Sequence, residues 1–133
     1  RVEGAPVRRA TGVWASLRRA PWGALGAVGP KCGDGMAGKG RGANPFIWAR
    51  QSLVGIVLVP DGEVAAARAA LLERAELLAE GAGAAPTAAV MFNKIDWQGK
   101  NVVAIISGGN IDAPVLCRQL ARGLAKLEKP AAA

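Results

Sequence analysis

The segment from Asn101 to Asn110, NVVAIISGGN, constrains the fold of this chain more than any other stretch. It contains five consecutive apolar residues, Val102 to Ile106, and four of them are β-branched, which is typical of a fully buried strand in a parallel sheet. Two glycines follow Ser107, and at the carboxyl end of such a strand they allow the backbone to approach a ligand closely. Asp112 and Pro114 then predict the start of a helix. Strand, glycine-rich turn and helix together predict a ligand site.

Length and composition indicate one globular domain. The chain has 133 residues, enough for a single modest core, and 51% of them are apolar, too many for a disordered tail. No apolar run approaches the roughly 20 residues of a membrane span, and the N-terminus shows no apolar signal core. We therefore expect a cytoplasmic protein without a membrane partner.

The formal net charge of +7 raises the question of nucleic-acid binding. Much of the excess positive charge lies before residue 51, where Trp14 and Trp22 are interleaved with it, and such clusters can hold phosphates and stack bases. They are more often simply solvated, so no nucleic-acid partner is expected.

Cysteine and histidine content narrows the possible chemistry. Cys32 and Cys117 match no zinc-binding spacing, and we expect two reduced thiols, with Cys117 on a helix. The chain has no histidine, which excludes a histidine-dependent hydrolase and a histidine-containing zinc site. No metal site is predicted.

The residue pattern divides the chain into three parts. Residues 1–53 are poorly patterned and rich in loops, with a long glycine- and proline-dense loop over 21–45 and a helix predicted over 45–53. Residues 54–128 are regularly patterned and make up the predicted α/β segment. Residues 129–133 are a frayed tail.

The α/β segment opens with a strand and a helix. Ile56 to Val59 is an apolar run that predicts a strand, and Pro60 ends it. Asp61 is placed to cap a helix from Glu63 to about Ala79, in which apolar residues recur at steps of three and four.

Two further helices are predicted. One runs from about Ala84 to Phe92, with Pro86 tolerated because it lies in the first turn. The other spans about Ala113 to Leu127, with a leucine stripe along one face. With the run from Val102 to Ile106 as the second strand, the order of elements implies an α/β layer with a parallel pair of strands.

Two motifs resemble sequences that bind nucleotides. Gly33 to Gly40, GDGMAGKG, nearly matches the phosphate loop GxxxxGK[ST], but its last residue lacks the hydroxyl that would bind magnesium. Asn93 to Asp96, NKID, matches the guanine-specificity motif NKxD, in which the carboxylate accepts hydrogen bonds from guanine. A GTP-binding or other non-catalytic module is therefore the alternative. We favour a polar helix-to-strand loop at NKID, because a helical segment precedes it rather than a buried strand.

Three runs of sequence carry a family resemblance through their order and spacing. They are IVLVPDGEV at Ile56 to Val64, LLAEGAGAAPTAAV at Leu77 to Val90, and KIDWQGKNVVAIISGGNID at Lys94 to Asp112. The segment from Val54 to Glu128 closely resembles the C-terminal part of the catalytic domain of threonine and serine dehydratases, which are ammonia-lyases with pyridoxal phosphate. A looser match extends upstream at Gly33 to Ala37. The resemblance implies a partial three-layer parallel-sheet domain, a fragment of the tryptophan-synthase-beta-like fold.

The resemblance also implies site residues. In that family the serine of SGGN hydrogen-bonds the pyridine nitrogen of the cofactor, and this role would fall on Ser107. A neutral hydroxyl leaves the ring nitrogen largely unprotonated, which favours β-elimination. Gly108 and Gly109 would let the backbone lie close to the ring edge, and Gly35 would border the ring and the substrate. Glu80 would line the pocket; a structural helix break is the other interpretation of that residue.

The implied reaction converts L-threonine or L-serine to a 2-oxo acid and ammonia, as in isoleucine biosynthesis. The family's covalent lysine and its phosphate-binding loop lie in an N-terminal segment that this chain does not have. Lys94 and Lys100 stand at the wrong motif positions to replace that lysine. We therefore expect part of a lyase that has no catalytic residue of its own and is inactive alone. The complete enzyme is expected to be a homo-oligomer.

Overall fold

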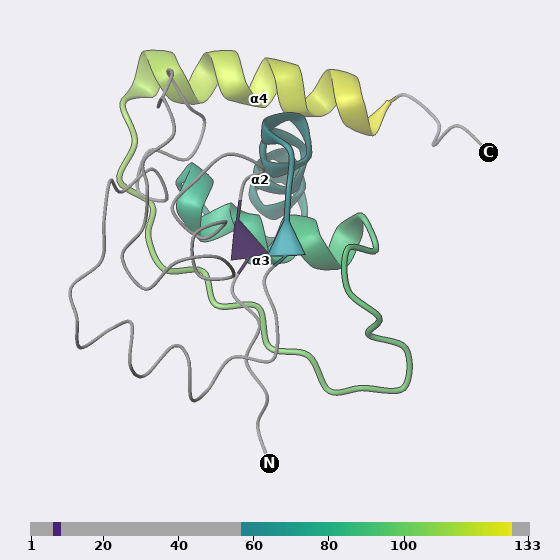
Figure 1. The fold of residues 1–133 in the computed structure, drawn as a ribbon. Coiled ribbons are helices and arrows are strands. Elements are labelled where there is room, and N and C mark those ends of the chain that lie inside the picture. Colours follow the sequence, from purple (N-terminus) through teal and green to yellow (C-terminus); the bar gives the residue numbers. More distant parts are fainter. Residues whose placement is uncertain (1–6, 9–56, 129–133) are drawn as a thin grey trace, which may run out of the picture.

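The computed structural model describes residues 7–8 and 57–128, and the predictions made for the remaining residues lie outside this part. The described elements are β1 (Val7–Arg8), β2 (Val57–Leu58), α2 (Asp61–Ala75), α3 (Gly81–Met91) and α4 (Ala113–Leu127). Helix α2 packs against both α3 and α4, and Figure 1 shows it between the two. The expected α/β class is confirmed as a partial domain with little sheet.

The two described strands form a parallel pair. Val57 lies opposite Val7 and Leu58 opposite Arg8, so the strand predicted over 56–59 exists in a shorter form. The chain then passes inward, because Val59 is buried before Pro60 leads into α2.

Helix α2 begins two residues earlier than predicted. Asp61 was expected to be the cap, but Pro60 occupies that position, and its carbonyl oxygen accepts hydrogen bonds from the amides of Glu63 and Val64 at 3.0 and 3.1 Å. Asp61 is instead the first helical residue. Acidic groups there interact favourably with the positive end of the helix dipole, so the residue type fits the first turn as well as the cap.

The same helix ends four residues before the predicted Ala79. Glu76 adopts a left-handed conformation with φ 54° and ψ 27°, and its amide donates to the carbonyl oxygen of Leu71. Apolar spacing continues through Leu77 and Leu78, which is why the pattern predicted a longer helix. Both leucines are exposed, so their spacing reflects no buried helix face.

Helix α3 begins at Gly81, three residues before the predicted start. Pro86 therefore lies inside the helix and not in its first turn, which makes that part of the prediction wrong. Because proline has no amide hydrogen, the carbonyl group of Ala82 loses its helical hydrogen bond. Small side chains let this helix lie close to its neighbours, and its buried residues are all glycine or alanine.

Helix α4 has the predicted bounds. Asp112 occupies the predicted cap position, although its side chain makes no capping hydrogen bond, and Cys117 is a free thiol on the helix, as expected. The leucines of the stripe are half-buried, and Gly123, the buried residue of α4, lies against Ala65 of α2. A Cβ atom at Gly123 would overlap the carbonyl oxygen of Ala65, so only glycine permits this contact.

Among the described helices, none combines the length and the apolar content needed to cross a membrane.

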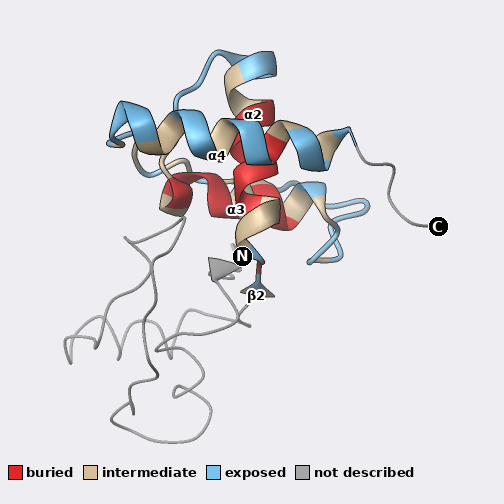
Figure 2. Ribbon diagram, turned by 90° about the horizontal axis from the view of Figure 1, so that it is seen from above, coloured by how far each residue is buried: buried red, intermediate tan, exposed pale blue. Residues whose placement is uncertain are grey.

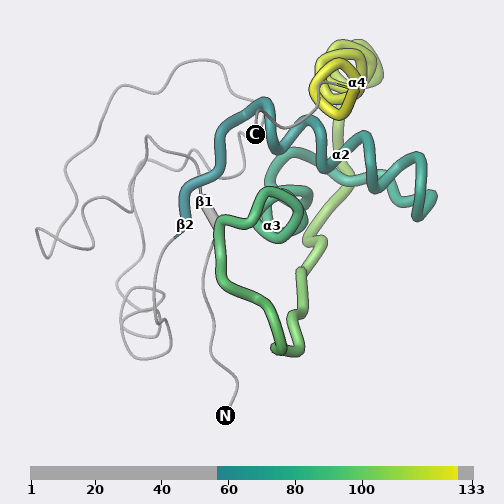
Figure 3. The backbone as a smooth tube through the Cα atoms, turned by 90° about the vertical axis from the view of Figure 1, so that its right-hand side faces the viewer, coloured from purple at the N-terminus to yellow at the C-terminus, as the bar shows by residue number. Residues whose placement is uncertain are grey.

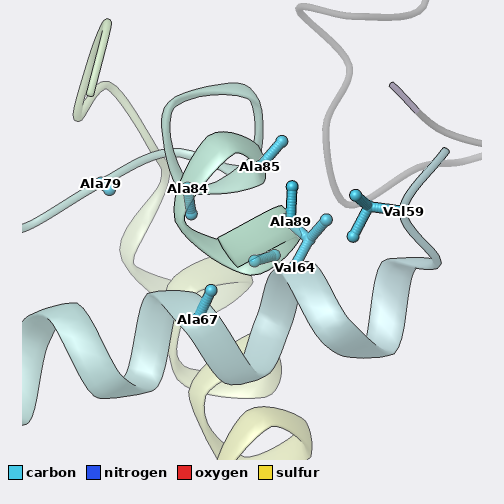
Figure 4. Packing of buried hydrophobic residues seen from close by; sticks show 8 residues of the cluster. Val59, Val64, Ala67, Ala79, Ala84, Ala85 and Ala89 are labelled. Carbon is cyan, nitrogen blue, oxygen red and sulfur yellow. The ribbon is translucent and has the colours of Figure 1, made fainter. Parts of the chain in front are cut away.

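The hydrophobic core lies between α2 and α3. It is built from two valines and six alanines, most of which Figure 4 labels: Val59, Val64, Ala67, Ala79, Ala84, Ala85, Ala88 and Ala89. Figure 2 shows the buried residues concentrated on these two helices, while the outer face of α4 is exposed.

The segment Val102 to Ile106 is not the buried strand that its composition predicts. It runs as an extended stretch between the loop after α3 and the start of α4 (Figure 3), and no strand is formed there in the described part of the chain. Val103 is 85% exposed and Ile105 70% exposed, while Ile106 packs against the core. The prediction fails because burial on both faces requires neighbouring strands and a second covering layer, and the described residues supply neither.

Candidate functional site

The two glycine-containing turns identified in the sequence meet in the structure. The backbone amide of Glu80 donates a hydrogen bond of 2.9 Å to the carbonyl oxygen of Gly108. A Cβ atom added to Gly83 would lie 2.7 Å from that same oxygen and 3.4 Å from the amide nitrogen of Ser107. The start of α3 is thus in direct backbone contact with the turn that follows Ile106.

The side chain of Glu80 covers this turn. A Cβ atom at Gly108 would lie 3.1 Å from Glu80 Oε1, a tighter separation than most real contacts of this kind. A Cβ atom added to Gly109 would lie even closer to the carbonyl oxygen of Leu78. The continuous stretch from Leu78 to Gly83 therefore lies against a turn where side chains larger than hydrogen would push the two apart.

Ser107 is one of the polar residues that this turn presents to solvent. Its neighbour Ile106 is held by the core, whereas Ser107 is exposed, and its hydroxyl makes no hydrogen bond to the residues that the structure describes. A hydroxyl in this position can donate to or accept from a ligand atom. Of the other predicted site residues, Glu80, Gly108 and Gly109 lie beside it, and Gly35 falls outside the described residues.

The exposed hydroxyl of Ser107 is the group in this turn that could meet the nitrogen of a pyridoxal ring. A neutral hydroxyl suits an unprotonated ring nitrogen. At Gly108 and Gly109, the positions to which a Cβ would point are taken by the Glu80 carboxylate and the Leu78 carbonyl group. Nothing comparable exists for a metal ion, since residues 7–8 and 57–128 contain no group of three or more acidic, cysteine or histidine side chains that could hold one.

The NKID motif takes part in local contacts instead of forming an open guanine site. Asn93 Oδ1 accepts a hydrogen bond of 3.1 Å from Trp97 Nε1, and Lys94 Nζ lies 3.0 Å from Glu63 Oε1. Asp96 pairs with Lys100 at 3.3 Å. The ion pair of Lys94 with Glu63 links α2 to the loop after α3, and no sequence signal predicts it because the two residues are far apart in the chain.

Comparisons with known proteins find L-threonine ammonia-lyases and dehydratases among the relatives of this chain. No protein-family model matches the chain. An L-threonine ammonia-lyase of Geobacter sulfurreducens is 46% identical over 92 residues, which are 68% of this chain and 23% of that protein. One of Thermotoga maritima is 43% identical over 97 residues, 73% of this chain and 24% of that protein. A catabolic L-threonine dehydratase of Staphylococcus aureus is 39% identical over 94 residues, 68% of this chain and 27% of that protein.

The chain is homologous to part of the L-threonine ammonia-lyases. It spans about a quarter of the length of these ammonia-lyases. Neither the structure nor these relatives support the GTP-binding alternative.

Solved structures share the fold of this chain. The crystal structure of a threonine deaminase matches with a TM-score of 0.70 and 26% identity, covering 81% of this chain and 37% of that one. A pyridoxal 5'-phosphate-dependent aspartate racemase matches with a TM-score of 0.66 and 21% identity, covering 81% and 35%. The serine racemase of Dictyostelium discoideum gives a TM-score of 0.61 at 21% identity, covering 84% and 46%.

Proposed function

We propose that this chain is part of a pyridoxal-phosphate-dependent threonine or serine ammonia-lyase and that it holds one edge of the cofactor. The observation that supports this most directly is the backbone contact between Glu80 and Gly108, which packs the turn after Ser107 against the start of α3. The contact occurs in a chain that is 46% identical to an L-threonine ammonia-lyase over 92 residues.

In this proposal Ser107 donates its hydroxyl hydrogen to the pyridine nitrogen. Pyridoxal phosphate supplies the electron sink for the elimination when it is bound. Gly108 and Gly109 keep the backbone close to the ring edge, and Gly35 borders the ring and the substrate. Glu80 places a carboxylate beside the same turn, where it lines the pocket.

We also propose that the chain is inactive by itself. The two lysines nearest in sequence to the site do not replace the family's covalent lysine, because both are engaged elsewhere. Lys94 pairs with Glu63, and Lys100 pairs with Asp96. The complete enzyme is proposed to be a cytoplasmic homo-oligomer that acts on L-threonine or L-serine in a pathway such as isoleucine biosynthesis.

A chimeric enzyme tests the role of Ser107. The matched segment of the Geobacter sulfurreducens L-threonine ammonia-lyase is replaced by the corresponding residues of this chain, and 2-oxobutanoate formation from L-threonine is measured. We expect activity, and we expect Ser107→Ala to lower kcat/KM at least tenfold, about 1.4 kcal/mol. Ser107→Thr keeps the hydroxyl and is the matched control.

Two outcomes contradict the proposal. One is a folded chimera that forms no 2-oxobutanoate, and the other is a Ser107→Ala chimera with unchanged turnover and unchanged cofactor retention on dialysis. Sustained 2-oxobutanoate formation by the isolated chain with pyridoxal phosphate would contradict the claim that it is inactive alone.

A further inference from the structure

The outer face of α4 carries a row of three cations. Arg118, Arg122 and Lys126 follow one another at intervals of four residues, so they lie along one side of the helix, and all three are exposed. Figure 2 shows the outer face of α4 open to solvent. The helix itself is held on α2 by the contact of Gly123 with Ala65, so the row has a fixed position.

The two arginines of this cation row have no partner that explains their position. Neither Arg118 nor Arg122 makes an ion pair or a hydrogen bond to the residues that the structure describes, while Lys126 Nζ lies 5.7 Å from the centroid of the Phe92 ring. Like charges four residues apart destabilise a helix. The helix dipole favours a cation in the last turn, which accounts for Lys126 but not for the arginines.

Positive charge is concentrated on this face. Residues 57–128 contain eight acidic and seven basic side chains, and three of those seven form the cation row. The rest of that segment therefore has eight acidic side chains and four basic ones. Next to α4, the acidic residues Asp112 and Glu128 stand only beyond its two ends. The row is thus a local positive surface that attracts an anionic partner.

A strip of small side chains runs beside the cation row. Its exposed members are Ala113, Cys117, Ala121 and Ala125, which also recur at intervals of four residues. Because these side chains are short, the backbone of a partner can lie close to the helix. No aromatic residue occurs in α4, so this face offers no ring on which nucleic-acid bases could stack. The surface favours a peptide over a nucleic acid.

The spacing of the cations indicates the conformation of such a peptide. Four residues of an α-helix rise by roughly 6 Å. Alternate residues of an extended strand point to the same side and lie about 6.7 Å apart. A row of carboxylates at alternate positions therefore nearly matches the cation row, and arginine can bind each carboxylate through two parallel hydrogen bonds.

We propose that the outer face of α4 binds an extended acidic peptide with glutamate or aspartate at alternate positions. Its carboxylates pair with Arg118, Arg122 and Lys126, and its backbone lies along the strip of small side chains. This binding surface does not depend on the function proposed above, because none of its residues contributes to the proposed cofactor site.

Two synthetic peptides of equal charge test the proposal. One has four glutamates alternating with serines, and the other has the same residues arranged as pairs of glutamates separated by pairs of serines. Each carries a fluorescent label, and its binding to the full chain is followed by fluorescence anisotropy at low salt. We expect the alternating peptide to bind at least about tenfold more tightly, because only its carboxylates match the spacing of the row.

Two double variants separate this surface from general electrostatic attraction. Arg118→Ala with Arg122→Ala removes two charges from the cation row, and Arg74→Ala with Lys100→Ala removes two exposed charges elsewhere. Circular dichroism checks that both variants keep the helices. We expect the first variant to bind the alternating peptide at least about tenfold more weakly, and the second to bind it within about twofold of the unchanged chain.

Three outcomes overturn the proposal. The first is equal affinity for the two peptides, and the second is an equal loss of affinity in the two double variants. The third is tighter binding of an oligothymidylate of the same charge that is lost with Arg118→Ala and Arg122→Ala, because a nucleic-acid backbone would then be the partner.

Discussion

The amide of Glu80 donates a hydrogen bond of 2.9 Å to the carbonyl oxygen of Gly108, and this bond joins the start of α3 to the turn that carries Ser107. A helix leaves its first amides without intrahelical partners, and an amide at the edge of α3 is here satisfied by a distant part of the chain. The position of the exposed serine consequently depends on how closely α3 can approach.

Gly83→Ala should separate these two segments. The added Cβ would lie 2.7 Å from Gly108 O, and backbone cannot move aside as a flexible side chain can. Overpacking of this kind destabilises by about 1–3 kcal/mol, enough to outweigh the roughly 1 kcal/mol that alanine gains over glycine in a helix. Urea denaturation of the chain measures the change.

Gly62→Ala is the matched control for that substitution. Its Cβ would meet only the flexible side chains of Lys126 and Arg122, the nearest atom lying at an ordinary separation of 3.5 Å. We expect unchanged stability or a gain of up to about 1 kcal/mol from helix propensity. Equal effects of the two substitutions would show that the contact with Gly108 is unimportant.

Gly123→Ala should loosen the packing of α4 on α2. The new Cβ would overlap the carbonyl oxygen of Ala65, so the two helices must move apart along their contact. We expect a loss of roughly 2–3 kcal/mol in the free energy of unfolding, near the upper end for overpacking. Ala121→Ser adds one heavy atom at an exposed position of the same helix and should cost about 0.5 kcal/mol. An unaffected urea midpoint in the Gly123→Ala variant would rule out the close approach.

Lys94→Met should destabilise the chain because it leaves Glu63 without its cation. The Glu63 side chain is 12% exposed, and Lys94 Nζ lies 3.0 Å from its carboxylate. Hydrogen bonds to charged groups contribute about 1.5–3 kcal/mol, and partial exposure of the lysine places our expectation near the lower value. Thermal denaturation at low and high salt measures the effect.

Lys100→Met is the comparison for this ion pair. Lys100 and Asp96 lie 3.3 Å apart with side chains 59% and 80% exposed, and such surface pairs contribute about 0–1 kcal/mol. A larger effect at Lys100 than at Lys94 would contradict the assignment of Lys94 and Glu63 as the structural pair.

Glu76→Gly should stabilise the end of α2. Glu76 has φ 54° and ψ 27°, a left-handed conformation that an L-residue adopts at about 1–2 kcal/mol and glycine adopts freely. Because glycine also increases the entropy of the unfolded chain, we expect a net gain of about 0.5–1 kcal/mol, read from the urea midpoint. Glu73→Gly, inside the same helix, should instead cost about 1 kcal/mol. A loss of stability at both positions would mean that α2 does not end at Glu76.

Local features of the sequence predicted most of the helices. The leucine stripe and the Asp112 cap position defined α4 with its observed bounds, and proline at residue 60 marked the end of β2. The ends of α2 and α3 were less predictable. Glu76 has no side chain typical of a left-handed residue, and the start of α3 at Gly81 depends on small residues that let the helix pack tightly.

The meeting of Glu80 with the turn after Ser107 was only partly predictable. The two glycine-containing turns are visible in the sequence, but which backbone atoms join them depends on how α3 lies against the core. No feature of the sequence indicates the ion pair of Lys94 with Glu63. Many charged residues could pair, and only the three-dimensional path of the chain determines which of them do.

The sequence by itself determined the leucine face of α4, the relatives and the chemical character of the proposed site, because periodicity and residue type act locally. Only the tertiary structure decided whether Val102 to Ile106 is buried. Whether a segment is buried depends on its neighbours as well as on its own residues. In the described part of the chain, Val103 and Ile105 have no strand beside them. An apolar β-branched run favours a strand inside a sheet, but other residues must form the rest of that sheet.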